Sequence, residues 1–244
     1  MRTNMSNVEK IPKIIHQIWL GPLDPPLEAM ESWKNLQPDW EYILWTEKNL
    51  PELKNQDAFD KSERYAQKAD ILRYEILFHY GGFFVDADEQ CIKNVTPLFD
   101  NIDKNDFDCF ASYEKENSTL VANGIMGCTK NNSFMKKMVD EINIDQDGYP
   151  WEIVGPGYLT RMIEKYKPAI YLFEPKVFLP IHYSDKHLRK IDLALLAQDP
   201  DIYGVQFWGS TTRAYRAKFK DSPSLFFQYW MNRFKGKRFT IKKN

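Results

Sequence analysis

Short apolar runs alternate along the chain with segments of helical spacing. Residues 13–19 (KIIHQIW) are apolar, rich in β-branched side chains and bounded by proline and glycine, which predicts a buried strand. A helix is expected over residues 25–36, where apolar side chains recur every three or four positions, and residues 42–45 predict a second strand. The order strand, helix, strand indicates a parallel crossover and hence an α/β fold.

The sharpest helical pattern lies in the next segment. One apolar stripe ends at Gly81-Gly82, and residues 83–85 follow as a third strand. The stripe consists of Tyr65, Ala69, Leu72, Ile76, Leu77 and Tyr80. Later patterns predict strands at 108–113, 124–129, 170–173 and 203–207, and helices at 133–142 and 157–166. With no internal repeat or linker, we expect a polar tail over 1–10 and one domain over 11–224.

Composition and charge narrow the function classes. The 244 residues are 43% hydrophobic and 15% aromatic, which excludes disorder as the main state, and a net charge of −1 gives no overall field for nucleic acid. Three cysteines without C-x-x-C spacing predict neither a disulfide framework nor a zinc site. The polar N-terminus and the lack of about 18 consecutive apolar residues predict a cytoplasmic protein.

The segment 225–244 departs from this balance. It combines aromatic side chains with six cations and no acidic residue. One interpretation is an interfacial helix at anionic lipid, which would place the protein at the inner face of a membrane beside a lipid-linked acceptor. The other is a terminal helix that packs on the domain with a solvated basic end. The sequence leaves both open.

A pair of carboxylates follows the third predicted strand. Asp86-Ala87-Asp88 is one of four D-x-D sequences in the chain, and it alone comes directly after an apolar strand that follows a glycine-terminated helix. Open α/β sheets bind ligands at this end of their strands, and residues spaced by one can reach the same hard ion. A site for Mg²⁺ or Mn²⁺ that stabilises a departing diphosphate is one interpretation. Capping of a surface turn is the other.

Two charged residues lie one turn apart on the preceding helix. Asp70 and Arg73 share a helix face, which the apolar stripe predicts to lie beside the core and not within it. A plain ion pair within the helix accounts for them equally well.

Two separated motifs resemble a known family. Residues 68–88 (KADILRYEILFHYGGFFVDAD) and 11–21 (IPKIIHQIWLG), with a less sharp third motif at 154–160 (VGPGYLT), resemble the DXD-type sugar glycosyltransferases. These include capsular and lipopolysaccharide glycosyltransferases, the yeast outer-chain-initiating mannosyltransferases and, distantly, the large clostridial glucosylating toxins. The resemblance covers most of the first 160 residues.

The resemblance implies a GT-A-type nucleotide-sugar-binding fold, with a mostly parallel central sheet flanked by helices, and a metal-dependent transfer that retains the anomeric configuration. Asp86 and Asp88 would bind the metal and the donor, and Asp70 and Arg73 would hold the hydroxyls of the donor sugar. Trp19 would stack on the base, and Asn123 would lie near the sugar. A second interpretation of Trp19 is a core tryptophan.

The chain departs from the resemblance near its end. Relatives carry a histidine, a tryptophan and a serine in a segment that closes over the metal, whereas this sequence has Gln206, Trp208 and Ser210. A carboxamide oxygen ligates Mn²⁺ less well than an imidazole, so Gln206 is a doubtful third metal ligand. An ordinary strand end with a loop is the alternative for Trp208 and Ser210. His182 and His187 are expected to be surface or hydrogen-bonded histidines.

The expected function is therefore transfer of a hexose from a nucleotide diphosphate sugar, UDP-hexose by preference and GDP-mannose as the alternative. The acceptor would be a saccharide or lipid-linked saccharide in surface polysaccharide synthesis. Two other classes stay open: a sugar-nucleotide or glycan binding module with weak catalysis, and a phosphohydrolase of the haloacid dehalogenase type. The second fits poorly because its D-x-D normally lies close to the N-terminus.

Overall fold

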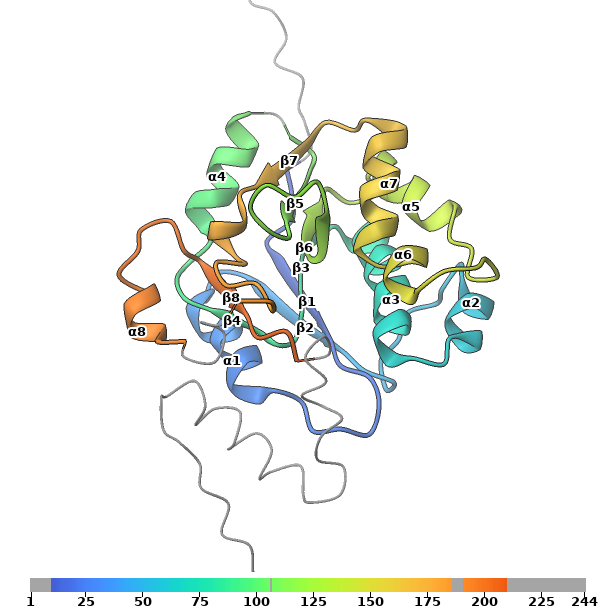
Figure 1. The fold of residues 1–244 in the computed structure, drawn as a ribbon, viewed down its shortest axis with the longest axis horizontal. Helices are drawn as coiled ribbons and strands as arrows, with labels where there is room; N and C mark the ends of the chain where they lie inside the picture. The colour runs from blue at the N-terminus through green and yellow to red at the C-terminus, as the bar shows by residue number, and fades with distance from the viewer. Residues whose placement is uncertain (1–9, 106, 186–190, 210–244) are drawn as a thin grey trace, which may run out of the picture.

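A six-stranded sheet forms the centre of the molecule (Figure 1). The structure is a computed structural model that describes residues 10–105, 107–185 and 191–209. The strand order is β2-β1-β3-β6-β5-β7. The strands are β1 (Ile14–Ile18), β2 (Glu41–Trp45), β3 (Gly82–Val85), β5 (Cys109–Tyr113), β6 (Val121–Cys128) and β7 (Ile170–Phe173). A separate antiparallel pair joins β4 (Glu89–Cys91) to β8 (Gly204–Gln206).

Five of the six strands run in the same direction. Strand β1 pairs in parallel with β2 and β3, and β5 with β7, while β6 is antiparallel to both β3 and β5. The carboxyl ends of β1, β3, β5 and β7 and the start of β6 therefore meet at one edge of the sheet. We call this the carboxyl edge, and open α/β sheets bind their ligands there. The predicted α/β class with a mostly parallel sheet is confirmed.

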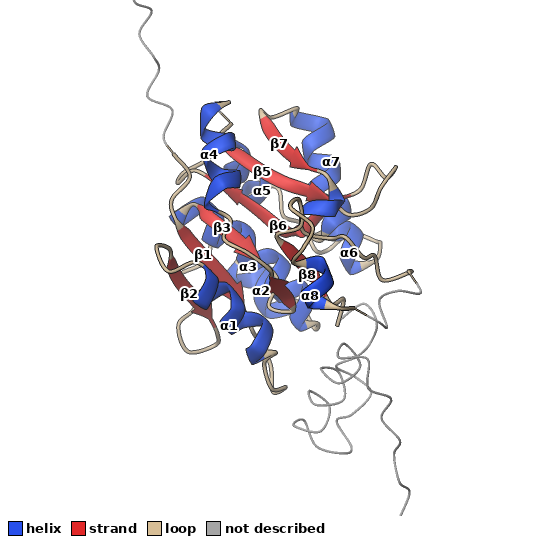
Figure 2. Ribbon diagram, turned by 90° about the vertical axis from the view of Figure 1, so that its left-hand side faces the viewer, coloured by secondary structure: helices blue, strands red, loops and turns tan. Residues whose placement is uncertain are grey.

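Helices cover both faces of the sheet (Figure 2). One face carries α2 (Gln56–Lys61), α3 (Tyr65–Tyr80), α5 (Ser133–Asp140), α6 (Pro150–Ile153) and α7 (Pro156–Tyr166). The other carries α1 (Leu27–Leu36), α4 (Thr96–Lys104), α8 (Leu193–Leu196), the 3-10 turn η1 (Pro175–Val177) and the β4–β8 pair. Each face has its own apolar core, one built around α3, α5 and α7 and one around α1 and the aromatic residues of β3 and β5.

Helix α3 is more deeply buried than its apolar stripe predicts. Every residue from Ile71 to Leu77 is buried, including Arg73, so the expectation that the Asp70–Arg73 face lies beside the core is wrong for Arg73. The helix is covered on all sides because α2 and α5 pack against it as well as the sheet. It ends as predicted at two glycines, with φ of 66° at Gly81 and 95° at Gly82. A Cβ on Gly81 would lie 2.6 Å from the backbone nitrogen of Lys130, so only glycine fits there.

Most predicted elements occur within a few residues of their expected bounds. Strand β4 and helices α2, α4, α6 and α8 had no prediction. Within the part of the chain that the structure describes, no helix is long and apolar enough to cross a membrane. The predicted tail over 1–10 (apart from Lys10), the end of the predicted domain and the basic segment 225–244 lie outside the described residues.

Candidate active site

The two carboxylates of the D-x-D sequence converge at the carboxyl end of β3. Asp86 continues the ladder with β6, because its N–H donates to the Gly124 carbonyl at 2.9 Å, and the chain then turns so that the Glu89 N–H reaches the Asp86 carbonyl at 3.0 Å. The carboxamide nitrogen of Gln206 lies 3.0 Å from Asp88 Oδ1 and 3.4 Å from Asp86 Oδ2. Both aspartates therefore point toward the same side chain.

Arg73 connects this turn to helix α3. Its guanidinium lies 3.0 Å from Asp70 Oδ1 and 3.2 Å from Asp86 Oδ1, and it donates to the Asn123 carbonyl at 2.5 Å. Its carbon Cζ also lies 4.4 Å from the centre of the Phe84 ring. The ion pair within the helix that the sequence allowed is present, but it belongs to a larger network that includes the D-x-D turn.

Asn123 joins the same network from the start of β6. Its Nδ2 donates to Asp70 Oδ1 at 2.9 Å and lies 3.1 Å from the hydroxyl of Tyr74. The Tyr74 hydroxyl in turn donates to the Val154 carbonyl at 2.8 Å, within the third sequence motif. Tyr74 was missed at the sequence level because a tyrosine within an apolar helix gives no signal of its own. The structure thus brings together Asp70, Arg73, Asp86 and Asn123.

The electrostatics of the site favour a bound cation. Burial, and then the charge of Asp86, raises the pKa of Asp88 to about 6, against hydrogen bonds from Gly209 and Gln206 that lower it. Burial likewise raises the pKa of Asp70 to about 7, although Arg73 and Asn123 oppose the shift. The neighbouring Glu89 is fully buried, and burial and the charges of Asp88 and Asp86 raise its pKa well above the ordinary range. Positive charge between Asp86 and Asp88 would relieve this repulsion.

The donor atoms suit a hard divalent ion that keeps open positions. Two carboxylates are present, and Gln206 Oε1 is buried without a hydrogen-bond partner. Rotation of the carboxamide by 180° would turn this oxygen toward both aspartates, where its Nε2 now lies. Among the described residues, no cluster of three or more His, Cys, Asp or Glu side chains could hold a metal. The set therefore fits Mg²⁺ or Mn²⁺ with its remaining positions open to water and phosphate oxygens.

The segment after β8 wraps around Asp88. The Phe207 N–H donates to the Asp88 carbonyl at 3.1 Å, and the Gly209 N–H donates to Asp88 Oδ2 at 2.6 Å. Between them Trp208 has a φ of 57°, and its indole N–H donates to the Ile181 carbonyl at 2.8 Å. The closing role of Trp208 over the diphosphate stays a prediction, and Ser210 is outside the described residues.

Trp19 lies at the same edge of the sheet, and its base-stacking role stays a prediction. It follows β1, is partly buried, and its indole N–H donates to the Leu23 carbonyl at 2.7 Å. A residue that sequence reasoning missed connects β1 to the turn: Gln17 Nε2 donates to the Asp86 carbonyl at 3.1 Å. The Tyr42 hydroxyl donates to Gln17 Oε1 at 2.6 Å and so fixes the orientation of this side chain.

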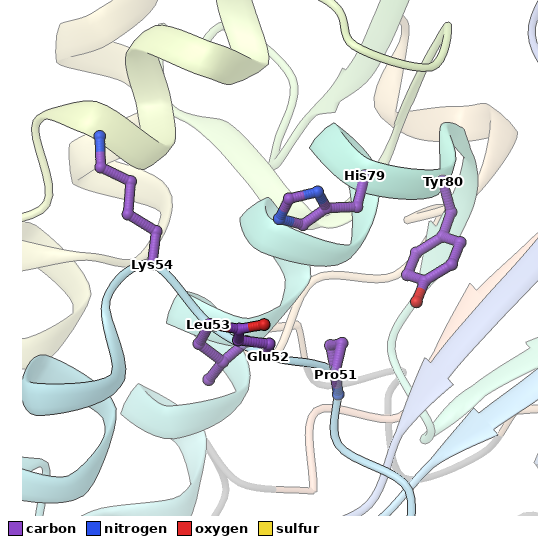
Figure 3. Close-up of a pocket in the computed structure, with 6 residues that line it drawn as sticks. All are labelled: Pro51, Glu52, Leu53, Lys54, His79 and Tyr80. Carbon is purple, nitrogen blue, oxygen red and sulfur yellow. The ribbon is translucent and has the colours of Figure 1, made fainter.

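A hollow at the far end of α3 is separate from these residues (Figure 3). It lies between residues 51–54 and the last turn of α3, where His79 and Tyr80 line it. Ten helical residues separate Asp70 from Tyr80, about 15 Å along the axis. The hollow is therefore no part of the candidate site.

Comparison with known proteins finds sequence similarity to glycosyltransferases over the part of the chain that carries these residues. Residues 26–108, which contain Asp70, Arg73, Asp86 and Asp88, match the glycosyltransferase sugar-binding region containing the DXD motif. The inositol phosphoceramide mannosyltransferase 3 of Schizosaccharomyces pombe is 31% identical over 138 residues, which are 53% of this chain and 36% of the relative. The mannosyl phosphorylinositol ceramide synthase SUR1 of Saccharomyces cerevisiae is 31% identical over 174 residues, 64% of this chain and 43% of the relative. The chain thus spans less than half the length of either relative.

Solved structures share the fold. The PaToxG glycosyltransferase superposes with a TM-score of 0.51 at 15% identity, covering 95% of this chain and 82% of that one. The ligand-free glycosyltransferase domain from the YGT toxin gives a TM-score of 0.51 at 10% identity, covering 67% and 80%. At this identity the likeness concerns the fold alone, and it is the GT-A type that the resemblance implied. With the match over residues 26–108, these findings show that the chain is similar in sequence and in fold to glycosyltransferases whose sugar-binding region contains a DXD motif.

Proposed function

We propose that the chain transfers a hexose from a nucleotide diphosphate sugar to a hydroxyl group, with a divalent metal held by Asp86 and Asp88. One observation carries this proposal. The two carboxylates and the unpartnered Gln206 oxygen lie at the carboxyl edge of the sheet, directly beside the buried Asp70–Arg73 pair. Oxygen ligands beside groups that can hold sugar hydroxyls are what a nucleotide-sugar site requires.

Each residue has a role in this chemistry. Mg²⁺ or Mn²⁺, when bound, supplies positive charge against the diphosphate. Asp70 accepts hydrogen bonds from the donor sugar, since its carboxylate keeps 13% of its surface exposed, and Arg73 fixes Asp70 and Asp86 relative to each other. The Gly209 N–H holds Asp88 Oδ2, so this carboxylate is positioned before the donor binds.

We further propose that the transfer retains the anomeric configuration. The acceptor oxygen forms its bond to the anomeric carbon on the face from which the diphosphate departs. The diphosphate takes the electron pair of the broken carbon–oxygen bond, and the acceptor proton passes to one of its oxygens. No carboxylate of the network is needed as a covalent nucleophile: Asp86 and Asp88 are committed to the metal, and Asp70 pairs with Arg73.

The relatives' names favour one donor and one acceptor class. Both yeast relatives are named for mannosyl transfer to inositol phosphoceramide, so GDP-mannose and a lipid-linked acceptor become the first pair to test. A UDP-hexose donor and a surface-polysaccharide acceptor such as capsule or lipopolysaccharide are the second pair. A lipid-linked acceptor would place the reaction at a membrane surface.

The test is release of nucleotide from a panel of GDP- and UDP-sugars, with Mn²⁺ or Mg²⁺. We expect slow release from one donor, faster with acceptor, and an NMR spectrum in which the product keeps the donor's anomeric configuration. Metal-dependent nucleotide binding without release from any donor would instead favour the sugar-nucleotide binding module. Neither binding nor release would reject both functions.

A further inference from the structure

The carboxyl edge has a second half, beyond β6, that the residues of the D-x-D network do not use. In the strand order β2-β1-β3-β6-β5-β7, Trp19 follows β1 on one side of the D-x-D turn, and Glu114 follows β5 on the other. The segment after β7 and η1 brings His182, Tyr183 and Ser184 to Glu114. If the nucleotide lies on the β1 side, this group of side chains lies on the side left for the acceptor.

A continuous chain of hydrogen bonds fixes this segment. Lys115 Nζ donates to the Ser184 hydroxyl at 3.3 Å, and that hydroxyl lies 2.7 Å from His182 Nδ1. The backbone N–H of Ser184 also donates to Nδ1, at 3.2 Å, so Nδ1 is an acceptor and the ring proton is on Nε2. Nε2 lies 3.2 Å from Glu114 Oε1, and the imidazole is only 9% exposed. The predicted hydrogen-bonded role of His182 is confirmed, and the segment has a fixed conformation.

Two aromatic rings pack on this imidazole. The ring centre of Tyr183 lies 3.9 Å from that of His182 and 5.5 Å from that of Trp208, whereas Trp208 is 5.3 Å from His182. Tyr183 is 44% exposed although it is held from behind, so it offers a ring surface to solvent. Such a surface, supported and exposed at the end of a sheet, is suited to stacking a ligand ring.

This surface is tied to the metal-binding residues. Trp208 is anchored to the Ile181 carbonyl, and the next residue, Gly209, donates its N–H to Asp88 Oδ2 at 2.6 Å. Segment 181–184, Trp208 and Asp88 are therefore joined by consecutive short contacts. A ring stacked on Tyr183 would be held at a fixed place relative to the reacting end of the donor.

We propose that Tyr183, supported by His182 and Trp208, is the acceptor subsite and binds the acceptor as a six-membered polyol ring. The apolar C–H face of such a ring packs on the tyrosine, whose π face is negative, while Glu114 and Lys115 at the same edge can pair with its hydroxyls. This inference rests on the proposed function and names the substrate class of its acceptor. The ring can be a pyranose or an inositol, which share this chemistry.

Substitutions at Tyr183 separate acceptor binding from donor chemistry. The experiment compares wild type, Tyr183→Ala, Tyr183→Phe and the matched control Tyr149→Ala, a tyrosine that is 69% exposed at the start of α6. Three probes distinguish the ring types: methyl α-D-mannopyranoside, methyl β-D-galactopyranoside and myo-inositol. We measure three quantities for each variant: the kinetics of transfer, the saturation-transfer NMR signal of each probe with Mg²⁺ and nucleotide, and the rate of donor hydrolysis without acceptor.

We expect Tyr183→Ala to raise KM for the best probe about tenfold or to remove its NMR signal, with donor hydrolysis within about twofold of wild type. Tyr183→Phe and Tyr149→Ala should behave as wild type, because both keep the Tyr183 ring face. An unchanged KM in Tyr183→Ala would overturn the subsite, as would an equal fall in donor hydrolysis. If wild type binds nucleotide but none of the probes, the acceptor subsite is overturned and the proposed function is retained. Absence of nucleotide binding would instead reject the proposed function.

Discussion

At the scale of single residues, Asp88 combines a proposed role as a metal ligand with a cost in stability. Its pKa is raised from an ordinary value near 4 to about 6, so its ionisation opposes folding. The unfolded chain loses this proton at lower pH than the folded protein does. Stability without metal therefore falls as the pH rises from about 4 through 6.

Asp88→Asn should consequently stabilise the metal-free protein at pH 8 by about 1–2 kcal/mol while removing activity. The new amide can also donate to Gln206 Oε1, which has no partner in the wild type. Urea unfolding in EDTA measures the gain, which should shrink toward pH 4.5, where the wild-type carboxyl is protonated. A variant that is less stable than wild type at both pH values would contradict this account of Asp88.

Arg73 and Asp70 should be strongly coupled. Arg73 is 5% exposed and faces two carboxylates, so Arg73→Met leaves buried charge unpaired and should destabilise by about 3 kcal/mol. Part of this loss should disappear when Asp70→Asn is added, giving an interaction free energy of about 1 kcal/mol or more in a double-mutant cycle. Additive effects would show that the contact contributes little. The pair Lys136–Asp140, exposed on α5, is a control for which additivity is expected.

The chemistry-bearing residues were largely predictable, and their supports were not. Asp70, Arg73, Asp86 and Asp88 carry charge at informative spacing, and the family resemblance implies the roles proposed for them. Gln17 and Tyr74 act through contacts with residues 69 and 80 positions away, for which the chain has no local pattern. The contact of Gln206 with both aspartates likewise spans about 120 residues.

At the scale of elements, the close approach of β3 and β6 leaves no room beside Asp86. A Cβ on Gly124 would lie 2.4 Å from Asp86 Oδ2, whereas a Cβ on Gly127 would lie 2.4 Å from the Gly82 carbonyl and from the Phe110 ring. The first neighbour is the end of a side chain and can move. The second includes backbone and cannot.

Gly124→Ala should therefore displace Asp86 and weaken metal-dependent nucleotide binding about tenfold or more, with a change in unfolding free energy under about 1 kcal/mol. Gly127→Ala should instead destabilise by about 2 kcal/mol or more. Calorimetric titration and urea unfolding measure the two effects. Equal nucleotide affinity in Gly124→Ala and wild type would show that Asp86 need not occupy its observed place.

His16 in β1 should make the sheet sensitive to acid. It is fully buried between the Gly81 carbonyl, 2.9 Å from Nε2, and the indole N–H of Trp45, 3.2 Å from Nδ1. When the imidazole is neutral, both of its nitrogens are hydrogen-bonded. Burial lowers the pKa of His16 from 6.5 to about 4. The unfolded chain binds this proton first, so stability is complete above about pH 7 and falls as the pH drops toward 4.

The expected loss is about 2–3 kcal/mol between pH 7 and pH 4. His16→Gln, which keeps a donor for the Gly81 carbonyl, should lose this component of the pH dependence in urea unfolding. An identical pH profile in the two proteins would mean that His16 is not the group responsible.

Element boundaries were least predictable where the site interrupts an apolar pattern. Strand β6 begins at Val121, three residues before the predicted start, because Asn123 is polar yet buried at 6% exposure by its bonds to Asp70 and Tyr74. Strand β4 had no prediction because its three residues include Glu89 and Gln90 and pair with β8, more than 110 residues later. Strand β3 follows its apolar run closely, because all four of its residues are buried.

At the scale of the whole molecule, the strand order places the side chains of the proposed site in three groups along the carboxyl edge. The D-x-D turn lies centrally, Trp19 and Gln17 lie on the β1 side, and the Glu114–His182–Tyr183 group lies on the β5–β7 side. Two apolar cores hold the sheet from both faces, so the ends of the strands keep their relative positions. The α/β class could be predicted because alternating strands and helices appear in the apolar pattern. The antiparallel placement of β6, which brings Asn123 to the site, could not.

Metal-dependent release of nucleotide tests the central claim most directly. The assay compares wild type with Asp88→Asn at pH 7.5, with the preferred donor and either Mn²⁺ or EDTA. The control is the double variant Asp145→Asn/Asp147→Asn, which changes a solvent-exposed D-x-D pair. We expect release by wild type and the control in Mn²⁺, abolition by EDTA, and a loss of at least about 100-fold in Asp88→Asn. Release by Asp88→Asn at the wild-type rate, or release that persists in EDTA, would contradict a metal-dependent transfer centred on Asp86 and Asp88.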